Sequence, residues 1–322
     1  NGFIYYLDYD LIALELSKMP DSDNLIDEFV AIVRNQAGGS VRNRFRIKGF
    51  LENTGIDFKN FASKKIAVEE EIKEQIQLQI KTGSRPYIPG SSLKGAIRTA
   101  VVSYFFTEEL EQNLKSTKEY IGQDILGRYD EDVLKFLQVS DTMPFGEEDL
   151  EIARFFRFNL KTNKLEIPMV KEVIPSDRES SFKIGSKAKP GQVDSKFQFL
   201  EEGKEELLFD IINAFSRKNV EYELKELNRS SSEELKAVKE FYQYLLDAVS
   251  AAHSAKEAYL RIGTGKTFFD TSIAHKLSKD FLNRIVRNNF KKANPNFFPK
   301  TRTMVQYKGQ KMAPGWVKLE KA

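Results

Sequence analysis

The chain has 322 residues, of which 41% are hydrophobic, enough for two domains of ordinary size, and its formal net charge is +3. The absence of cysteine excludes disulfide bonds, thiolate nucleophiles and zinc–cysteine sites, and no apolar run reaches the roughly eighteen residues of a membrane span. We expect a cytoplasmic protein without membrane contact, and because residue 1 is Asn and a strand pattern starts at once, we expect further residues upstream.

In the first half, helical and strand patterns alternate irregularly. Strands are expected at residues 3–7, 75–80, 137–140, 152–160 and 165–174, and a capped helix at 92–111. This is the pattern of an α+β fold. Residues 180–193 are rich in Ser, Lys, Gly and Pro and indicate a flexible loop or a domain boundary, so we predict domains at 1–185 and 186–322.

The second half starts with a helical stretch at 204–254, whose last helix places Val238, Phe241, Tyr242, Leu245 and Val249 on one face. A short strand at 258–262, a glycine turn and a helix at 272–288 with a basic outer stripe follow. Two strand-like runs around a Gly/Pro turn close the chain.

The positive charge is concentrated at the C-terminal end. Residues 253–322 contain 15 Lys and Arg against 4 Asp and Glu, a net of +11, whereas the remainder has 35 against 43, a net of −8. Two further windows lack acids: residues 34–48 hold five cations, including R-N-R-F-R, and residues 81–98 hold four. This asymmetry predicts a polyanionic partner.

The stretch P-Y-I-P-G-S-S-L-K-G-A-I-R at 86–98 joins a turn to a helix. Its apolar residues follow a helical period, and Ser91 or Ser92 is the expected N-cap. Glycine allows another backbone to come close, and a helix N-terminus favours an anion. The alternative is an ordinary capped surface helix. The residues expected on the face opposite the apolar stripe are Ser91, Lys94, Gly95 and Arg98.

The run G-T-G-K-T at 263–267 resembles part of a P-loop. That motif requires glycine five residues before the second glycine, and Leu260 stands there. We therefore predict that the turn binds no nucleotide and that Lys266 faces some other anion.

Two histidines are candidates for general acid–base catalysis. His253 continues an apolar helix face, so we expect a packed or interface residue, and His275 lies beside Lys276, so we expect a solvated one. No metal-ligand spacing occurs, and we predict neither a metal nor a cofactor.

Aromatic residues stand among the cations, as in proteins that track phosphates while they stack bases. They are Phe45, Tyr87, Tyr307 and Trp316. Each one alone is more often a core residue.

Four segments together resemble the RAMP family, the RNA-binding subunits of CRISPR effector complexes. They are I-P-G-S-S-L-K-G-A-I-R (88–98), V-S-D-T (139–142), L-R-I-G-T-G-K-T (260–267), and P-K-T-R with P-G-W-V-K-L (299–302 and 314–319). The last pair is most similar to the fifth Csm subunits of type III-A complexes, which sit at the 3′ end of the guide RNA. The resemblance implies two ferredoxin-like (RRM-like) modules with helical insertions.

The resemblance also implies a noncatalytic role: capping the complex, holding the 3′ part of the guide RNA and assisting its maturation by host nucleases. The implied partners are guide RNA, other Csm subunits including a neighbouring backbone RAMP subunit, and those nucleases. Combined with the charge pattern, the expected RNA-binding residues are Arg42, Arg44, Arg46, Gly90, Ser91, Ser92, Lys94, Gly95, Arg98, Gly263, Gly265, Lys266, Lys300 and Arg302.

Two features depart from the family pattern. The initial T-P-hydrophobic-H-x-G segment is absent, and the aspartate with which target-cleaving relatives cut RNA has no counterpart that we can place. Two alternatives stay open: a metal-independent endoribonuclease that uses His253 or His275 to process precursor guide RNA, and a protein–protein adaptor.

Overall fold

The computed structural model describes residues 2–37, 44–68, 72, 74–114, 116, 121–253 and 256–322. The described backbone divides into two compact units. These units are groups of residues in mutual contact. The predicted domains, 1–185 and 186–322, are a different kind of division and stay a prediction. The first unit contains Asn1–Gln79, Glu148–Arg154 and Met169–Ser176, and the second contains Ile80–Glu147, Phe155–Pro168 and Asp177–Ala322.

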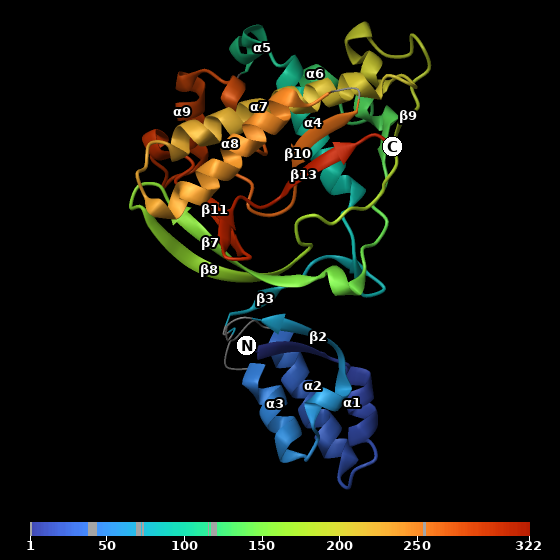
Figure 1. Ribbon diagram of the computed structural model, residues 1–322. Helices are drawn as coiled ribbons and strands as arrows, with labels where there is room; N and C mark the ends of the chain where they lie inside the picture. The colour runs from blue at the N-terminus through green and yellow to red at the C-terminus, as the bar shows by residue number, and fades with distance from the viewer. Residues whose placement is uncertain are drawn as a thin grey trace. The chain divides into compact units, whose positions relative to one another are not determined.

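In the first unit, three helices follow strand β1 and precede its partner β2 (Figure 1). β1 confirms the strand expected at 3–7, and it pairs antiparallel with β2. The Asp8 carboxylate accepts hydrogen bonds from the first turn of α1, so a local polar residue starts this helix. The bounds are β1 (Gly2–Leu7), α1 (Tyr9–Leu16), α2 (Ser22–Ala37), α3 (Arg44–Asn53), β2 (Ala62–Val68) and β3 (Ile76–Gln77).

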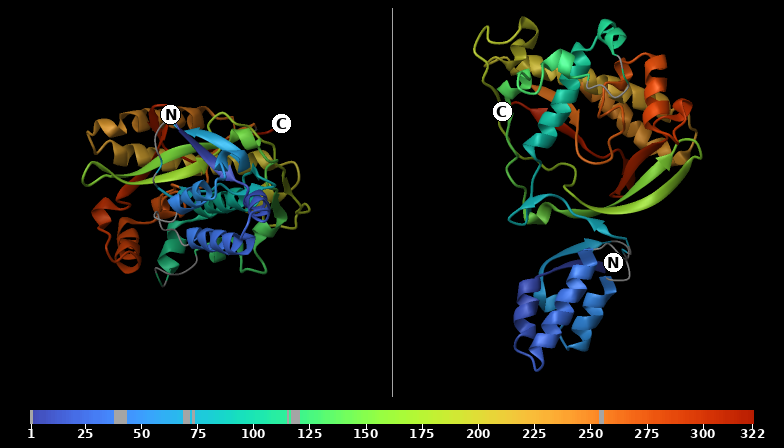
Figure 2. Two further views of the ribbon diagram at one scale, coloured as in Figure 1. Left: turned by 90° about the horizontal axis from the view of Figure 1, so that it is seen from below. Right: turned by 180° about the vertical axis from the view of Figure 1, so that it is seen from behind.

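The second unit contains the other helices, among which α7 is central because it contacts α4, α8 and strand β10 (Figures 1 and 2). The apolar faces predicted for α4 and α8 are confirmed: Leu93, Ile97 and Val101 of α4 are buried, as are Val238 and Tyr242 of α8. The bounds are α4 (Gly90–Phe105), α5 (Glu108–Asn113), α6 (Gln123–Leu126), α7 (Glu205–Leu227), α8 (Lys236–Ala251) and α9 (Lys279–Asn289).

The largest sheet has the strand order β12-β11-β7-β8-β3, and shorter pairs are β4–β5, β6–β9 and β10–β13. With these sheets and the helices, the predicted α+β class is confirmed. The remaining bounds are β4 (Lys81–Thr82), β5 (Arg85–Pro86), β6 (Leu137–Val139), β7 (Glu151–Asn159), β8 (Lys164–Val173), β9 (Ile184–Ser186), β10 (Glu257–Arg261), β11 (Thr301–Tyr307), β12 (Gln310–Met312) and β13 (Trp316–Glu320).

Several predicted boundaries are wrong. The helix expected at 92–111 begins earlier, with Pro89 as its N-cap and without a side-chain cap from a serine, and it ends at Phe105. The helix expected at 272–288 is interrupted, because Ser278 Oγ accepts a hydrogen bond from Phe281 N (3.2 Å) and starts α9 anew. The strand expected at 75–80 is only β3. Among the described residues, every helix is too short or too polar to cross a bilayer.

Candidate nucleic-acid interface

The first two family segments meet at the start of α4. Gly90 N donates a hydrogen bond to Asp141 Oδ1 (2.7 Å), and Ile88 and Thr142 exchange two further hydrogen bonds. A Cβ on Gly90 would lie 2.4 Å from the carbonyl oxygen of Val139. Protein backbone therefore occupies the space that the missing side chain leaves at Gly90.

The two cations of α4 also bind within the protein. Lys94 Nζ donates to the carbonyl oxygen of Leu137 (2.7 Å), and Arg98 Nη1 lies 2.5 Å from Asp132 Oδ2. The expectation that both side chains lie on an open face is wrong, since Lys94 is half-buried and the Arg98 side chain is 31% exposed. The cause is that residues 132–137 pack beside the helix and supply oxygen atoms to both cations.

The smaller residues of this helix remain accessible. Ser91, Ser92 and Gly95 are exposed, and a Cβ on Gly95 would meet nothing within 4 Å. Of the residues predicted to bind phosphate on this helix, the two serines and Gly95 are therefore the ones that a ligand can reach.

The predicted arginines of R-N-R-F-R belong to the first unit. Arg46 is exposed on α3, Arg44 is the first residue of that helix, and the side chain of Arg44 and the whole of Arg42 lie outside the described part.

The third and fourth family segments also meet, at the glycine loop after β10. Gly263 and Gly265 adopt φ angles of +70° and +91°, which favour glycine. A Cβ on Gly265 would lie 2.9 Å from Pro314 Cγ, and Ile262 N donates to the carbonyl oxygen of Gly315 (2.8 Å). Gly263 is exposed, so the outer tip of the loop can accept a ligand.

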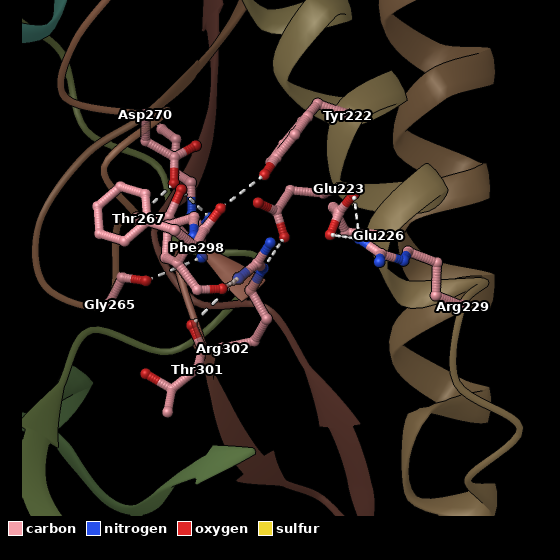
Figure 3. A network of polar contacts seen from close by, with 12 residues as sticks. Tyr222, Glu223, Glu226, Arg229, Gly265, Thr267, Asp270, Phe298, Thr301 and Arg302 are labelled. Carbon is pink, nitrogen blue, oxygen red and sulfur yellow. Dashed lines mark hydrogen bonds and ion pairs between the residues drawn. The ribbon is translucent and has the colours of Figure 1, made fainter. Parts of the chain in front are cut away.

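A buried ion pair holds this loop, and Figure 3 shows Gly265, Thr267 and Asp270 of the network. Arg261 Nη1 lies 2.8 Å from Asp270 Oδ2, and the two side chains are 3% and 1% exposed. Asp270 Oδ2 also accepts from Thr267 N (2.6 Å), while Arg261 Nη2 donates to the carbonyl oxygen of Gly265 (3.2 Å). Burial opposes the charge of Arg261, but Asp270, Tyr242 and Glu223 outweigh this cost and raise its pKa.

A second buried pair joins β11 to α7. Arg302 Nε donates to Glu223 Oε2, and Arg302 Nη1 donates to the carbonyl oxygen of Pro299 (2.6 Å). Burial raises the pKa of Glu223, although Arg302 acts in the opposite direction. The Arg302 side chain is 5% exposed, and this counts against a direct phosphate contact, whereas neighbouring Lys300 is exposed.

Lys266 lies between the buried network and the exposed loop tip. Its side chain is half-buried, and burial lowers its pKa. After Lys266 the chain forms turns rather than the helix of a P-loop. We expect Lys266→Ala to leave the rate of ATP hydrolysis at background level, measured as phosphate release by the purified chain. Hydrolysis that this substitution abolishes would contradict that expectation.

The expectation of a solvated His275 is wrong. His275 Nε2 lies 3.0 Å from Ser103 Oγ, and burial, with Lys218 and Lys276 nearby, lowers its pKa to about 4. His253 is exposed, so it is not packed within the described part of the chain, and its expected place at an interface stays a prediction. Within the described ranges, no group of His, Asp and Glu could hold a metal ion.

Four acidic residues that hold the motif residues were not predicted from the sequence. Asp132, Asp141, Glu223 and Asp270 determine how the motif residues are held, yet only Asp141 stood inside a quoted motif. For Asp270 a weak signal exists, because it follows Thr267 by three residues and can cap the turn. Asp132 and Glu223 have no local signal.

Known proteins resemble this chain along nearly its whole length. The RAMP superfamily matches residues 36–269. A curated relative, "CRISPR system Cms protein Csm5" of Methanocaldococcus jannaschii, is 25% identical over 99% of this chain and 82% of its own length. The Csm5 of Streptococcus thermophilus is 34% identical over 31% of this chain and 30% of its own length.

Two solved structures share the fold. A chain of a type III-A Csm–crRNA–target RNA ternary complex has a TM-score of 0.68 at 20% identity and covers 100% of this chain and 93% of its own. The crystal structure of T. onnurineus Csm5 has a TM-score of 0.61 at 19% identity, with 99% and 93% covered. At these identities the comparison establishes a common fold.

Proposed function

The chain belongs to the RAMP superfamily, and from this premise we propose that it is a noncatalytic, RNA-binding subunit of a type III-A CRISPR effector ribonucleoprotein that holds and caps the 3′ part of the guide RNA. The observation that carries the proposal is the similarity to a Csm5 protein over 99% of the chain. The contacts between the family segments also support it. The first two segments meet at the start of α4, and the last two meet at the glycine loop after β10.

The proposed partners follow from the same premise. They are the guide RNA, other Csm subunits including the neighbouring backbone RAMP subunit, and host nucleases that trim the guide. We further propose that the β-strands and helices form two ferredoxin-like modules with helical insertions. The net charge of +11 in residues 253–322 supports a polyanionic partner.

The proposed RNA contacts are the accessible members of the predicted set. Phosphate oxygens can accept hydrogen bonds from serine hydroxyls and backbone N–H groups and can pair with lysine and arginine. The exposed or half-buried candidates are Arg46, Ser91, Ser92, Gly95, Gly263, Lys266 and Lys300. Gly90, Lys94, Arg98, Gly265 and Arg302 take part in contacts within the protein and would act by shaping the site.

The noncatalytic part of the proposal is supported by the state of His275. A group whose pKa is lowered to about 4 is neutral near pH 7, and its ring is hydrogen-bonded to Ser103, so it is poorly suited to donate a proton to RNA.

We expect the purified chain to bind single-stranded RNA mainly through phosphates. The logarithm of the affinity should fall linearly with the logarithm of salt concentration, by about 0.7 for each phosphate neutralised, and base identity should matter little. Fluorescence anisotropy over a salt series measures this slope. Affinity that does not change with salt would favour the adaptor alternative.

A second assay addresses the endoribonuclease alternative. Repeat RNA incubated with the chain in the absence of metal ions should stay intact on a denaturing gel. One defined cut that His275→Ala or His253→Ala removes would overturn the noncatalytic assignment.

A further inference from the structure

α9 and the segment that follows it form a basic part of the second unit. Between Asp280 and Glu320 the sequence has nine Lys and Arg residues and no Asp or Glu. The first five of these cations are all exposed, and we refer to them as the α9 basic face. They are Arg284, Arg287, Lys291, Lys292 and Lys300.

The helical period separates this face from the core. Phe281, Ile285 and Val286 of α9 are buried, whereas Arg284 and Arg287, one turn apart, lie on the opposite side and are exposed. The guanidinium carbon of Arg284 also lies over the ring of Phe281 (4.8 Å to the centroid), which is a cation–π contact within the helix.

The cations of this face differ from those of α4 and β11 in their partners. Arg98 pairs with Asp132, and Arg302 pairs with Glu223. In contrast, neither Arg284 nor Arg287 makes an ion pair with any residue in the described ranges. An approaching phosphate would therefore not have to break an ion pair to reach these two guanidinium groups.

Two partly exposed phenylalanines lie within the same segment. Phe290 and Phe297 are each 37% exposed. The Phe290 ring is held by Phe268 and Phe298, at centroid distances of 5.5 and 4.8 Å. Phe268 directly follows the glycine loop, so its contact with Phe290 places the end of α9 next to that loop. Arg229 lies over the ring of Phe297 (5.8 Å to the centroid). Exposed rings among cations are the arrangement on which single-stranded nucleic acid stacks its bases.

We propose that the α9 basic face is the principal phosphate-binding surface for single-stranded RNA, with Phe290 and Phe297 as stacking platforms. This inference rests on the proposed function, because it assumes that the chain binds RNA. It changes the location of the main contacts from α4 to α9. The cations of α4 and β11 then hold the protein together, and the glycine loop borders the binding surface.

The test compares charge-neutralising pairs in the full chain, with a fluorescent oligouridylate as the probe. Arg284→Gln with Arg287→Gln should weaken binding and make the salt slope shallower by about 1.4, two contacts at about 0.7 each. The matched control is Lys187→Gln with Lys189→Gln, two exposed cations after β9, which lies on the opposite side of the second unit from α9 (Figure 1). The control should bind like the wild type.

Two further variants keep the test independent of helix stability. Lys291→Gln with Lys292→Gln changes only the turn after α9 and should also reduce the slope. Phe297→Leu should weaken binding without a change in slope, because stacking neutralises no phosphate. The melting temperature of each variant shows whether it is folded.

The outcomes separate this inference from the proposed function. A wild-type chain that does not bind the probe overturns the proposed function. If the wild type binds the probe and both double variants of the α9 basic face bind it as tightly as the wild type, RNA binding stands. The assignment of RNA binding to the α9 basic face is then wrong. Equal losses in the α9 pair and in the Lys187 and Lys189 control would also overturn it, because general charge would then explain the binding.

Discussion

Arg302→Met should lower the free energy of unfolding by about 3–5 kcal/mol, because it leaves the carboxylate of Glu223 buried without its partner. The methionine fills most of the volume of the arginine stem, so the loss of charge pairing is the main change. Equilibrium unfolding in urea, followed by circular dichroism, measures this difference.

The control is the double variant Arg302→Met with Glu223→Leu. Removing both charges of a buried pair is often close to neutral, so the double variant should recover most of the loss. If Arg302→Met alone is as stable as the wild type, Glu223 is not an ionised partner in the folded protein.

The defect of Arg302→Met should depend on pH. Burial raises the folded-state pKa of Glu223, and removal of Arg302 takes away an influence that lowers it. When a carboxyl group has a higher pKa in the folded than in the unfolded state, its ionisation destabilises the fold at pH values above the folded-state pKa. Below the unfolded-state pKa the group is protonated in both states, and this destabilisation disappears. The difference in stability from the wild type should therefore shrink as the pH is lowered from about 8 to about 5.

Gly90→Ala should destabilise the second unit by about 3 kcal/mol or more. The new Cβ would lie 2.4 Å from the carbonyl oxygen of Val139, and backbone cannot yield as the end of a side chain can. Moving α4 away would also break the hydrogen bond from Gly90 N to Asp141. Thermal unfolding of the purified variant measures the effect.

The matched control is Gly95→Ala in the same helix. Its Cβ meets nothing within 4 Å, and alanine favours a helix over glycine by up to about 1 kcal/mol, so this variant should be slightly more stable than the wild type. Its RNA affinity is informative as well. A loss of binding without a loss of stability would place RNA backbone against Gly95, and a fold that tolerates Gly90→Ala would contradict the close approach at α4.

Local patterns in the sequence predicted the elements whose formation depends on near neighbours. The strand at 3–7, the neighbouring strands β7 and β8 and the buried face of α8 follow from periods of two or 3.6 residues, which a short window of sequence displays. The break before α9 was missed although its cap, Ser278, is local, because the apolar period continues across the break.

The candidate site was predictable in composition but not in its contacts. The glycine positions at 263 and 265 indicated a tight loop, and the structure gives both residues a positive φ angle. The burial of His275 against Ser103 depends on a residue 172 positions away, and nothing near His275 indicates it.

By itself, the sequence determined the α+β class, the apolar faces of α4 and α8, the glycine loop and the concentration of positive charge near the C-terminus. Only the tertiary structure decided which cations are available to a ligand. Lys94, Arg98 and Arg302 are bound by partners 43, 34 and 79 residues away, whereas Arg284 and Arg287 stay exposed. The physical reason is that charge and helical period are properties of a short segment, while an ion pair forms between segments that only packing of the core brings together.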